Sequence, residues 1–291
     1  MPTLSRYRRA LLLLGTLGGI SLPGASRAAL APTGRAGNVD FVHGDTRISD
    51  AKGVRSLQVG TPVFAGQTVQ TGDDSEVHVL LDDGGYLTVR QRSSVLINSA
   101  RIQGTFDDSL AMTLLKGAMR SITGWVGKFD KQNYQLTVGT ATVGIRGTDH
   151  ELALIQEEGQ EPDQIVGIHN WVNSGATTLK NASGSMDIEA GQAAWAEHSG
   201  RRAPRLHVGL PAFLQRFHSR HEARAENHAR TVREHIEERM RKRGFLHMGE
   251  HLEDVLARHQ RRQQRRQAFQ QHLQRQQEVR ARRQWRRKAD E

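Results

Sequence analysis

The 291-residue chain is strongly basic, with a formal net charge of +10, and contains no cysteine. The missing cysteine excludes disulfide bonds, a thiol nucleophile and a lipid-modified cysteine anchor. With 36% hydrophobic residues, the chain is long and apolar enough to bury a sizeable core.

The N-terminal residues predict an export signal. Arg6, Arg8 and Arg9 precede the apolar run 10–22, and small residues follow as far as Ala28. The run is shorter than the ~20 residues that a membrane-spanning helix needs. We therefore predict a signal peptide over residues 1–28 and export to the periplasm. Since no later run is apolar enough to cross a bilayer, we expect no transmembrane segment in the mature chain.

Charge divides the rest of the chain into two parts. Residues 29–204 contain 15 basic and 20 acidic residues, whereas residues 205–291 contain 22 basic and 11 acidic ones. The basic character of the whole chain therefore belongs to its C-terminal part. We expect a mildly acidic folded domain that carries a cationic extension.

Residues 29–204 predict an all-β fold. Short runs rich in Val, Ile, Leu and Thr alternate with glycine-containing turns, at residues 39–42, 77–81, 86–89, 95–97, 135–138 and 141–145. Within the second run, Val77, Val79 and Leu81 alternate with Glu76, His78 and Leu80, so the two sets lie on opposite faces. Because such short strands must bury their apolar faces against one another, we expect a sandwich, a barrel or a solenoid. The segment 104–130 is less regular and predicts a loop or a short helix.

The most informative segment is residues 140–155. An Ala/Val/Ile strand leads into Arg146-Gly147-Thr148, and a second strand follows at residues 151–155. Glycine adopts positive φ readily, so this segment alone predicts a hairpin that turns at Gly147. The structural interpretation has Arg146 and Thr148 bind backbone carbonyls or a neighbouring carboxylate, and the functional alternative is contact with a ligand.

In its context, this segment resembles part of the FecR domain, an extracytoplasmic module. The runs 69–73, 75–84 and 86–90 precede it, the runs 165–169 and 188–192 follow it, and the ordered set is more specific than any one run. The resemblance extends over residues 34–197. It implies a compact, solenoid-like stack of short strands.

FecR proteins are regulators of ferric-siderophore uptake. Besides this domain, they carry a cytoplasmic anti-sigma segment, a membrane helix and a C-terminal part that contacts the signalling domain of a TonB-dependent transporter. The present sequence resembles the domain alone, so we expect binding or scaffolding rather than direct control of a sigma factor. The family usually has an aromatic residue at the position of His150. Together with Asp149 and Glu151, this histidine offers a pH- or metal-sensitive spot, but a polar loop or edge position is the simpler interpretation.

We predict a linker at residues 198–210 and a basic helical region at residues 211–291. A first helix begins near Pro211 and ends at Gly244, and its apolar stripe consists of Phe213, Phe217, Ala225, Val232, Ile236 and Met240. A second helix begins near Met248 and turns Leu252, Val255 and Leu256 inward, so the pair predicts an αα-hairpin. Beyond residue 257 the apolar positions thin out, which predicts either a solvated helix or a segment that orders on binding.

Nine of the fourteen histidines lie after residue 204. His221, His228 and His235 are seven residues apart and share one helix face. His247 and His251 are four apart, the spacing at which two imidazoles on a helix reach one metal ion. These five histidines are candidate metal ligands. The simpler interpretation is that a solvated helix rich in His, Arg and Gln contains such pairs by chance, and we predict no cofactor.

Residues 258–288 contain 12 basic residues and one acidic residue. Guanidinium groups pair bidentately with phosphate, so ridges of arginine suit polyanions. The candidate contacts are Arg258, Arg261, Arg262, Arg265, Arg266, Arg282, Arg283, Arg286 and Arg287. Because export separates the chain from nucleic acid, we expect an envelope protein partner or an anionic surface, such as lipid phosphate or acidic glycan. A charged helix without a dedicated partner is the alternative.

No catalytic motif is evident in the sequence. It lacks a Gly-x-Ser-x-Gly elbow, a His-Glu-x-x-His pair and a phosphate-binding glycine loop. We therefore predict a non-enzymatic binding, scaffold or signalling-related protein of the periplasm, with the cationic helices as a second interaction surface. The alternative is a polyanion- or metal-binding envelope protein that acts through those helices.

Overall fold

A computed structural model describes residues 34–157, 165–209, 211–212, 221–242, 244, 246–247 and 249–289, with side chains as far as residue 278. The predicted signal peptide at residues 1–28 lies outside these residues, as do Phe213, Phe217 and Met248 of the predicted helices. The predicted mainly β fold followed by two C-terminal helices is confirmed.

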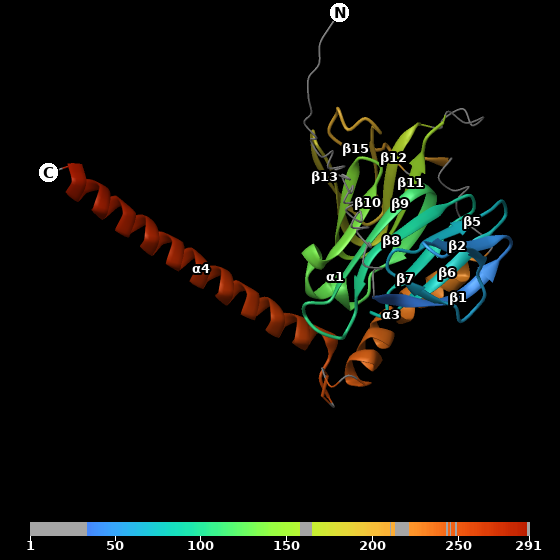
Figure 1. Cartoon of the computed structure of the whole chain (residues 1–291), viewed down its shortest axis with the longest axis horizontal. Helices are drawn as coiled ribbons and strands as arrows, with labels where there is room; N and C mark the ends of the chain where they lie inside the picture. The colour runs from blue at the N-terminus through green and yellow to red at the C-terminus, as the bar shows by residue number, and fades with distance from the viewer. Residues whose placement is uncertain are drawn as a thin grey trace, which may run out of the picture. The chain divides into compact units, whose positions relative to one another are not determined.

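Fifteen strands form in the described part of the chain (Figure 1). They are β1 (Arg35–His43), β2 (Thr46–Asp50), β3 (Gly53–Ser56), β4 (Pro62–Phe64), β5 (Thr68–Thr71), β6 (Glu76–Leu81), β7 (Tyr86–Val89), β8 (Ser94–Arg101), β9 (Ser109–Ile122), β10 (Tyr134–Val138), β11 (Ala141–Ile155), β12 (Gly167–Asn181), β13 (Gly184–Glu189), β14 (Ala193–Ala196) and β15 (Arg205–Leu206). The helices are α1 (Trp125–Phe129), the 3-10 turn η1 (Lys131–Asn133), α3 (Glu222–Lys242) and α4 (Leu252–Ala289).

Three long strands organise the sheet because each one changes neighbours along its length. The first half of β9 pairs with β8 and β10, and its second half pairs with β7 and β11. Likewise, β11 pairs first with β10 and then with β9, while β12 pairs first with β14 and then with β13. The sheet is thereby divided into two layers. The remaining strands of the first layer are β2, β3, β5, β8, β10 and β13, and those of the second are β1, β4, β6, β7, β14 and β15.

The main core lies between the two layers. Ile48, Val69 and Ile97 from the first layer join Val79 and Leu87 from the second in one cluster, and all five side chains are fully buried. Burial of a side chain of this size stabilises a fold by roughly 1.5–3 kcal/mol. Two layers that share one core make the arrangement sandwich-like.

The predicted hairpin at Gly147 is wrong, because β11 runs without a break from Ala141 to Ile155. Gly147 has φ +63, and the register with β12 shifts between Arg146 and Asp149, so the glycine forms a β-bulge. Gly175 lies opposite on β12 with φ +78, and a Cβ atom there would come within 2.6 Å of the Gly147 carbonyl oxygen. Glycine on both strands is what allows the bulge.

The segment 104–130 is more regular than predicted. It contains the 14-residue strand β9 as well as the short helix α1. The strand was missed because Gly117 interrupts its apolar pattern, and in the structure this glycine has φ +79 inside the strand. α1 adds Trp125 to the core, where its Nε1 donates to Asp108 Oδ2 at 3.0 Å.

The C-terminal helices begin by packing on the β domain. α3 lies against the outer face of the second layer at β7 (Figure 1). Its Ala225, Ile236 and Met240 are buried, as the predicted stripe requires. Gly244, with φ +76, follows α3, and Leu252 and Val255 at the start of α4 are each 3% exposed. The predicted linker contributes a strand of its own, because β15 pairs with β14.

Most side chains of α4 from residue 260 to residue 278 are exposed to solvent, including Phe269 at 63%. Among the described helices there is none whose length and apolar character suit a bilayer span.

Candidate functional site: a buried charge network under α3

The outer face of the second layer carries charged side chains on neighbouring strands. Successive side chains of a strand point to opposite faces. Glu76 on β6, Arg120 on β9 and Glu151 on β11 therefore point away from the core between the layers, while Val77 beside Glu76 points into it. This polar face is nevertheless buried: Glu151 is 1% exposed and Arg120 is 5% exposed. Charged groups at such depth are stable only when they are paired.

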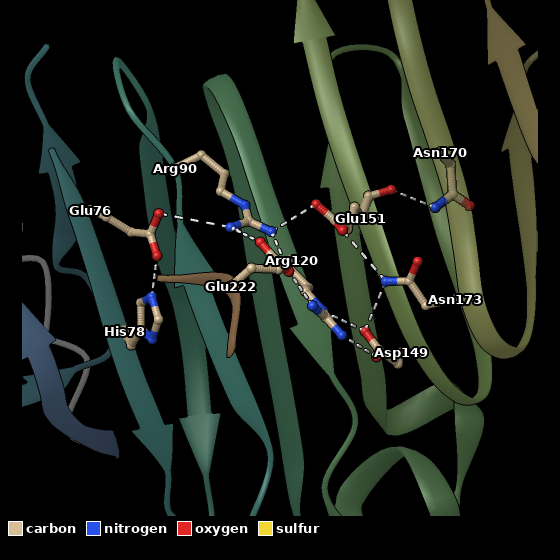
Figure 2. A network of polar contacts seen from close by, with 9 residues as sticks. All are labelled: Glu76, His78, Arg90, Arg120, Asp149, Glu151, Asn170, Asn173 and Glu222. Carbon is tan, nitrogen blue, oxygen red and sulfur yellow. Dashed lines mark hydrogen bonds and ion pairs between the residues drawn. The ribbon is translucent and has the colours of Figure 1, made fainter. Parts of the chain in front are cut away.

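Arg90, directly after β7, is at the centre of the network (Figure 2). Its Nη2 donates to Glu151 Oε2 and to Glu222 Oε1, both at 3.0 Å. Its Nη1 lies 2.6 Å from Glu222 Oε2 and 3.7 Å from Glu76 Oε2. Arg90 therefore joins β6, β7 and β11 to the start of α3.

Arg120 forms the second half of the network (Figure 2). Its Nε donates to Asp149 Oδ1 at 2.8 Å and its Nη2 donates to Asp149 Oδ2 at 2.6 Å, which is a bidentate pair. Its Nη1 donates to Glu222. Charge-assisted bidentate pairs are the stronger and more directional hydrogen bonds of proteins. Arg120 therefore ties β9 to β11 on one side and to α3 on the other.

Glu222 is the residue on which both arginines converge. Burial alone would raise the pKa of this carboxyl, but the guanidinium groups of Arg90 and Arg120 lower it to about 2. Burial alone would lower the pKa of Arg90, yet Glu151, Glu222 and Glu76 together raise it above its ordinary value. Glu222 and the two arginines are therefore charged at neutral pH, and their contacts are fixed ion pairs rather than an acid or a base.

Further polar side chains extend the network at its two ends. Asn173 Nδ2 lies 3.3 Å from Asp149 Oδ1 and 3.4 Å from Glu151 Oε1, so it donates to both carboxylates. At the other end, Glu76 pairs with His78, whose Nδ1 lies 3.1 Å from the Tyr86 hydroxyl. These contacts hold the carboxylates in place from β6 to β12.

The rest of α3 covers the same face through polar and aromatic contacts. Tyr86 donates from its hydroxyl to Asp40 Oδ2 at 2.6 Å, and the ring of His228 stacks on it at 4.5 Å. His228 Nε2 lies 3.0 Å from the Gly84 carbonyl oxygen, and Arg239 donates to the Asp82 carbonyl oxygen at 2.9 Å. Ile236 and Met240 add apolar contacts with the main core, so polar contacts and apolar packing together define how α3 sits on the sheet.

The Arg146-Gly147-Thr148 motif lies at the bulge of β11, outside the charge network. Arg146 Nη2 donates to Glu189 Oε1 at 2.8 Å on the exposed surface. The Thr148 hydroxyl donates to the Ala176 carbonyl oxygen at 2.7 Å and accepts from the Arg146 backbone N–H at 3.0 Å.

The expectation of a polar loop or edge position for the next three residues is wrong. Asp149, His150 and Glu151 lie inside β11, which has strands on both sides, and all three are buried. Asp149 and Glu151 point into the charge network, whereas His150 points the other way and receives a hydrogen bond from Asn170 at 3.1 Å. Burial lowers the pKa of His150 to about 4, so this histidine is neutral at pH 7.

The candidate metal ligands are distributed over several places. His221 lies against the rings of Phe41 and His43, and His228 and His235 stack on each other with ring centroids 4.9 Å apart. His247 and His251 belong to the segment between α3 and α4. Within the described residues, no group of three or more His, Asp or Glu side chains has the arrangement of a metal site.

The arginines of α4 fall into two groups. Arg258 pairs with Glu250 at 2.8 Å. In contrast, Arg261, Arg262, Arg265, Arg266 and Arg275 form no ion pair or hydrogen bond with another described residue. Within this second group, Arg262 and Arg266 line a groove of about 450 Å³ together with Asp107 and Asp130. The side chains of the predicted contacts Arg282, Arg283, Arg286 and Arg287 lie outside the described part.

Sequence reasoning missed Arg90, Arg120 and Glu222 as a site. The alternation in β6 does put Glu76 and His78 on the face opposite the apolar one, and the same pattern on β11 was a usable signal, but the interrupted pattern of β9 was not. What the pattern cannot show is that a helix beginning at Glu222, far along the chain from β11, covers this face.

Comparison with known proteins identifies the domain. Residues 67–165, from β5 to just beyond β11, match the family model described as FecR protein. The chain therefore contains a FecR domain, as its ordered motifs indicated.

A search among curated proteins finds no match. Among solved structures, two crystal structures of an anti-sigma factor candidate from Parabacteroides distasonis are similar to this chain. One is 9% identical with a TM-score of 0.38, and the other is 10% identical with a TM-score of 0.37. Each alignment covers 48% of this chain and 58% of the solved chain.

Proposed function

We propose that this protein is a non-enzymatic, signalling-related binding or scaffold protein of the cell envelope. Its FecR domain is the rigid part, and the cationic helix α4 is a second contact surface. The match of residues 67–165 to the FecR family supports the class of function. The predicted signal peptide supports the periplasm as its location.

The observation that carries this proposal is the attachment of α3 to the FecR domain. Arg90 and Arg120 bind Glu222 on a buried face, and Leu252 at the start of α4 belongs to the main core cluster. His259 of α4 also stacks on Phe106 at 4.3 Å, and Gln263 donates to Asp130 Oδ2 at 3.3 Å, so the helical region is built onto the domain as far as Gln263. Beyond that point α4 presents exposed side chains, which suits a part of the protein that meets a partner.

A second candidate function is polyanion binding by α4. The observation that favours it is the set of arginines between residues 261 and 275 that have no ion pair within the described residues. Such groups are available for phosphate or sulfate oxygens, and their attraction weakens as salt increases. The alternative of metal binding has no comparable support, because the five candidate histidines do not converge.

The position of the truncation decides whether an experiment can separate these functions. Removal of everything after residue 204 would delete Glu222 and leave Arg90 and Arg120 without their shared carboxylate. A chain that ends at residue 257 keeps α3, Leu252 and Val255 and removes the basic part of α4. A full-length chain with Arg261, Arg262, Arg265 and Arg266 changed to Gln is the matched control for charge.

We would crosslink three proteins in intact cells, namely the wild type, the chain that ends at residue 257 and the Gln variant, and identify the captured partners. If the FecR domain binds the partner, the same partner is captured by all three proteins. If α4 binds it, capture is lost in the truncated chain and in the Gln variant. Polyanion binding predicts that the purified full-length protein is retained on heparin or on anionic vesicles at low salt and that the Gln variant is not. Recovery of the protein from the cytosol with residues 1–28 intact would contradict the envelope role.

A further inference from the structure

Glu222 differs from the other charged members of the network because it does not belong to the sheet. Among the nine residues drawn in Figure 2, it alone comes from a helix, and it is the first residue of α3. Its side chain is 17% exposed, whereas those of Arg90, Glu76 and Glu151 are 1–4% exposed. Glu222 is therefore the most exposed charged side chain of the network, although its carboxylate oxygen Oε2 is itself buried.

The two arginines that bind Glu222 are held in place by contacts with the strands alone. Without Glu222, Arg90 keeps its 3.0 Å contact with Glu151, and Arg120 keeps its bidentate pair with Asp149. Each guanidinium is therefore held in place by a carboxylate of β11 while another of its edges faces Glu222. Arg90 also has an unused hydrogen-bond donor, since its buried Nε has no partner within the described residues. A pair of arginines fixed in this way is preorganised for an anion.

We propose that Arg90 and Arg120 form a carboxylate-binding site, that Glu222 of α3 is its internal ligand, and that an acidic segment of a partner protein binds this FecR domain by replacing Glu222. The proposal rests on the proposed binding function, for which it names the receiving surface and the chemical class of the partner. A partner needs to displace only the first turn of α3, because Glu222 is the first residue of this helix and the apolar contacts of Ile236 and Met240 with the main core lie about four turns further along.

The surroundings select a carboxylate rather than a phosphate. Glu76, Asp149 and Glu151 lie within the same network, and each carries a negative charge that a second anion must approach. The position is also largely buried, and the cost of removing an ion from water rises with the square of its charge, whereas attraction by the two arginines rises only in proportion to it, so the site favours a monoanion over a dianion. The low pKa of Glu222 shows that attraction by the two arginines outweighs the repulsion for a single carboxylate.

Chemical rescue tests this site in the purified mature chain. The change Glu222→Ala removes a CH2–COO⁻ unit, which has the size of acetate, so acetate should occupy the gap. We expect the melting temperature of the variant to fall by roughly 4–8 °C, because two buried guanidinium contacts are lost. Sodium acetate should then raise it with saturation, by at least half of the loss, relative to sodium chloride at the same ionic strength. Phosphate should have a smaller effect.

Two control variants separate binding from general stabilisation by salt. Glu222→Gln loses the charge but fills the gap, so it should melt at a lower temperature than the wild type and show no acetate-specific gain. Glu226→Ala changes an exposed residue on the next turn of α3, and it should respond to acetate as the wild type does. Equal acetate responses in all four proteins, or a larger gain with phosphate, would overturn the proposal. Because this assay contains no partner, its failure would leave the crosslinking test of the proposed function unaffected.

Discussion

Arg90 provides the most direct test of the buried network, because its removal leaves buried carboxylates without a cation. The change Arg90→Met keeps the length of the side chain and deletes the guanidinium. It leaves Glu151 and Glu76, with side chains 2% and 4% exposed, without the cation that neutralises them. Removal of one partner from a buried ion pair typically costs 3–5 kcal/mol. We expect a loss of this size, equivalent to a decrease of about 1–2 M in the urea midpoint.

Arg92 is the matched control for Arg90. It lies two residues further along the chain and also pairs with a carboxylate, Asp73, but the two side chains are 69% and 77% exposed. Exposed pairs contribute little, so Arg92→Met should hardly move the urea midpoint. Unfolding would be followed at pH 7 by far-UV circular dichroism and tryptophan fluorescence, and coincident transitions would justify a two-state fit.

The coupling of Arg90 to Glu222 can be measured with the same assay. Because the two residues are in contact, the double variant Arg90→Met, Glu222→Gln should be more stable than the sum of the single losses predicts, by at least about 1 kcal/mol. If the midpoint of Arg90→Met moved no further than that of Arg92→Met, the charge network would not stabilise the fold, and our account of the α3 interface would be refuted.

Three further predictions concern the bulge and two buried titratable groups. Gly175→Ala should lower the free energy of unfolding by roughly 2–4 kcal/mol in thermal melts, since φ is +78 and the new Cβ meets the Gly147 carbonyl. The control Gly191→Ala, at φ +80 with nothing within 4 Å of the new Cβ, should lower it by only about 1 kcal/mol. Burial lowers the pKa of His150 to about 4. The unfolded chain therefore binds its proton first, and the wild type should lose up to about 3 kcal/mol between pH 6.5 and pH 4, a loss that His150→Phe should avoid in urea titrations across this range. Burial raises the pKa of Asp83 to about 6, so its charge is unfavourable above that pH; Asp83→Asn should be more stable than the wild type at pH 7.5 by up to about 3 kcal/mol, and this difference should vanish near pH 4.

The strands of the domain were largely predictable from local pattern. The runs at residues 77–81 and 86–89 correspond to β6 and β7, because alternating apolar residues between glycine turns suit a strand that buries one face. Local pattern was insufficient at Gly147. A glycine with positive φ fits both a hairpin turn and a bulge in a continuous strand, and the choice depends on the partner strand with its own glycine, Gly175.

The candidate site was less predictable than the fold. Glu76 and Glu151 could be placed on polar strand faces, whereas Arg120 lies on β9, which was not predicted. A polar face usually contacts water, and nothing local distinguishes a charge in solvent from one under a helix. The same limit applies to His150, whose neighbours in sequence are charged although it is buried. Such pairings join residues as far apart as Arg90 and Glu222, and their distance in sequence hides them from any window of a few residues.

The sequence by itself determined that β-strands come first and basic helices follow, because hydrophobic periodicity and glycine placement act over a few residues at a time. It also indicated the FecR domain, because the order of the motifs can be recognised in the sequence without knowledge of which residues are in contact. The tertiary structure alone decided that two arginines from the sheet share the carboxylate of Glu222 on α3. The physical reason is that burial and ion pairing depend on distance in space, and folding brings together charges that the chain keeps apart.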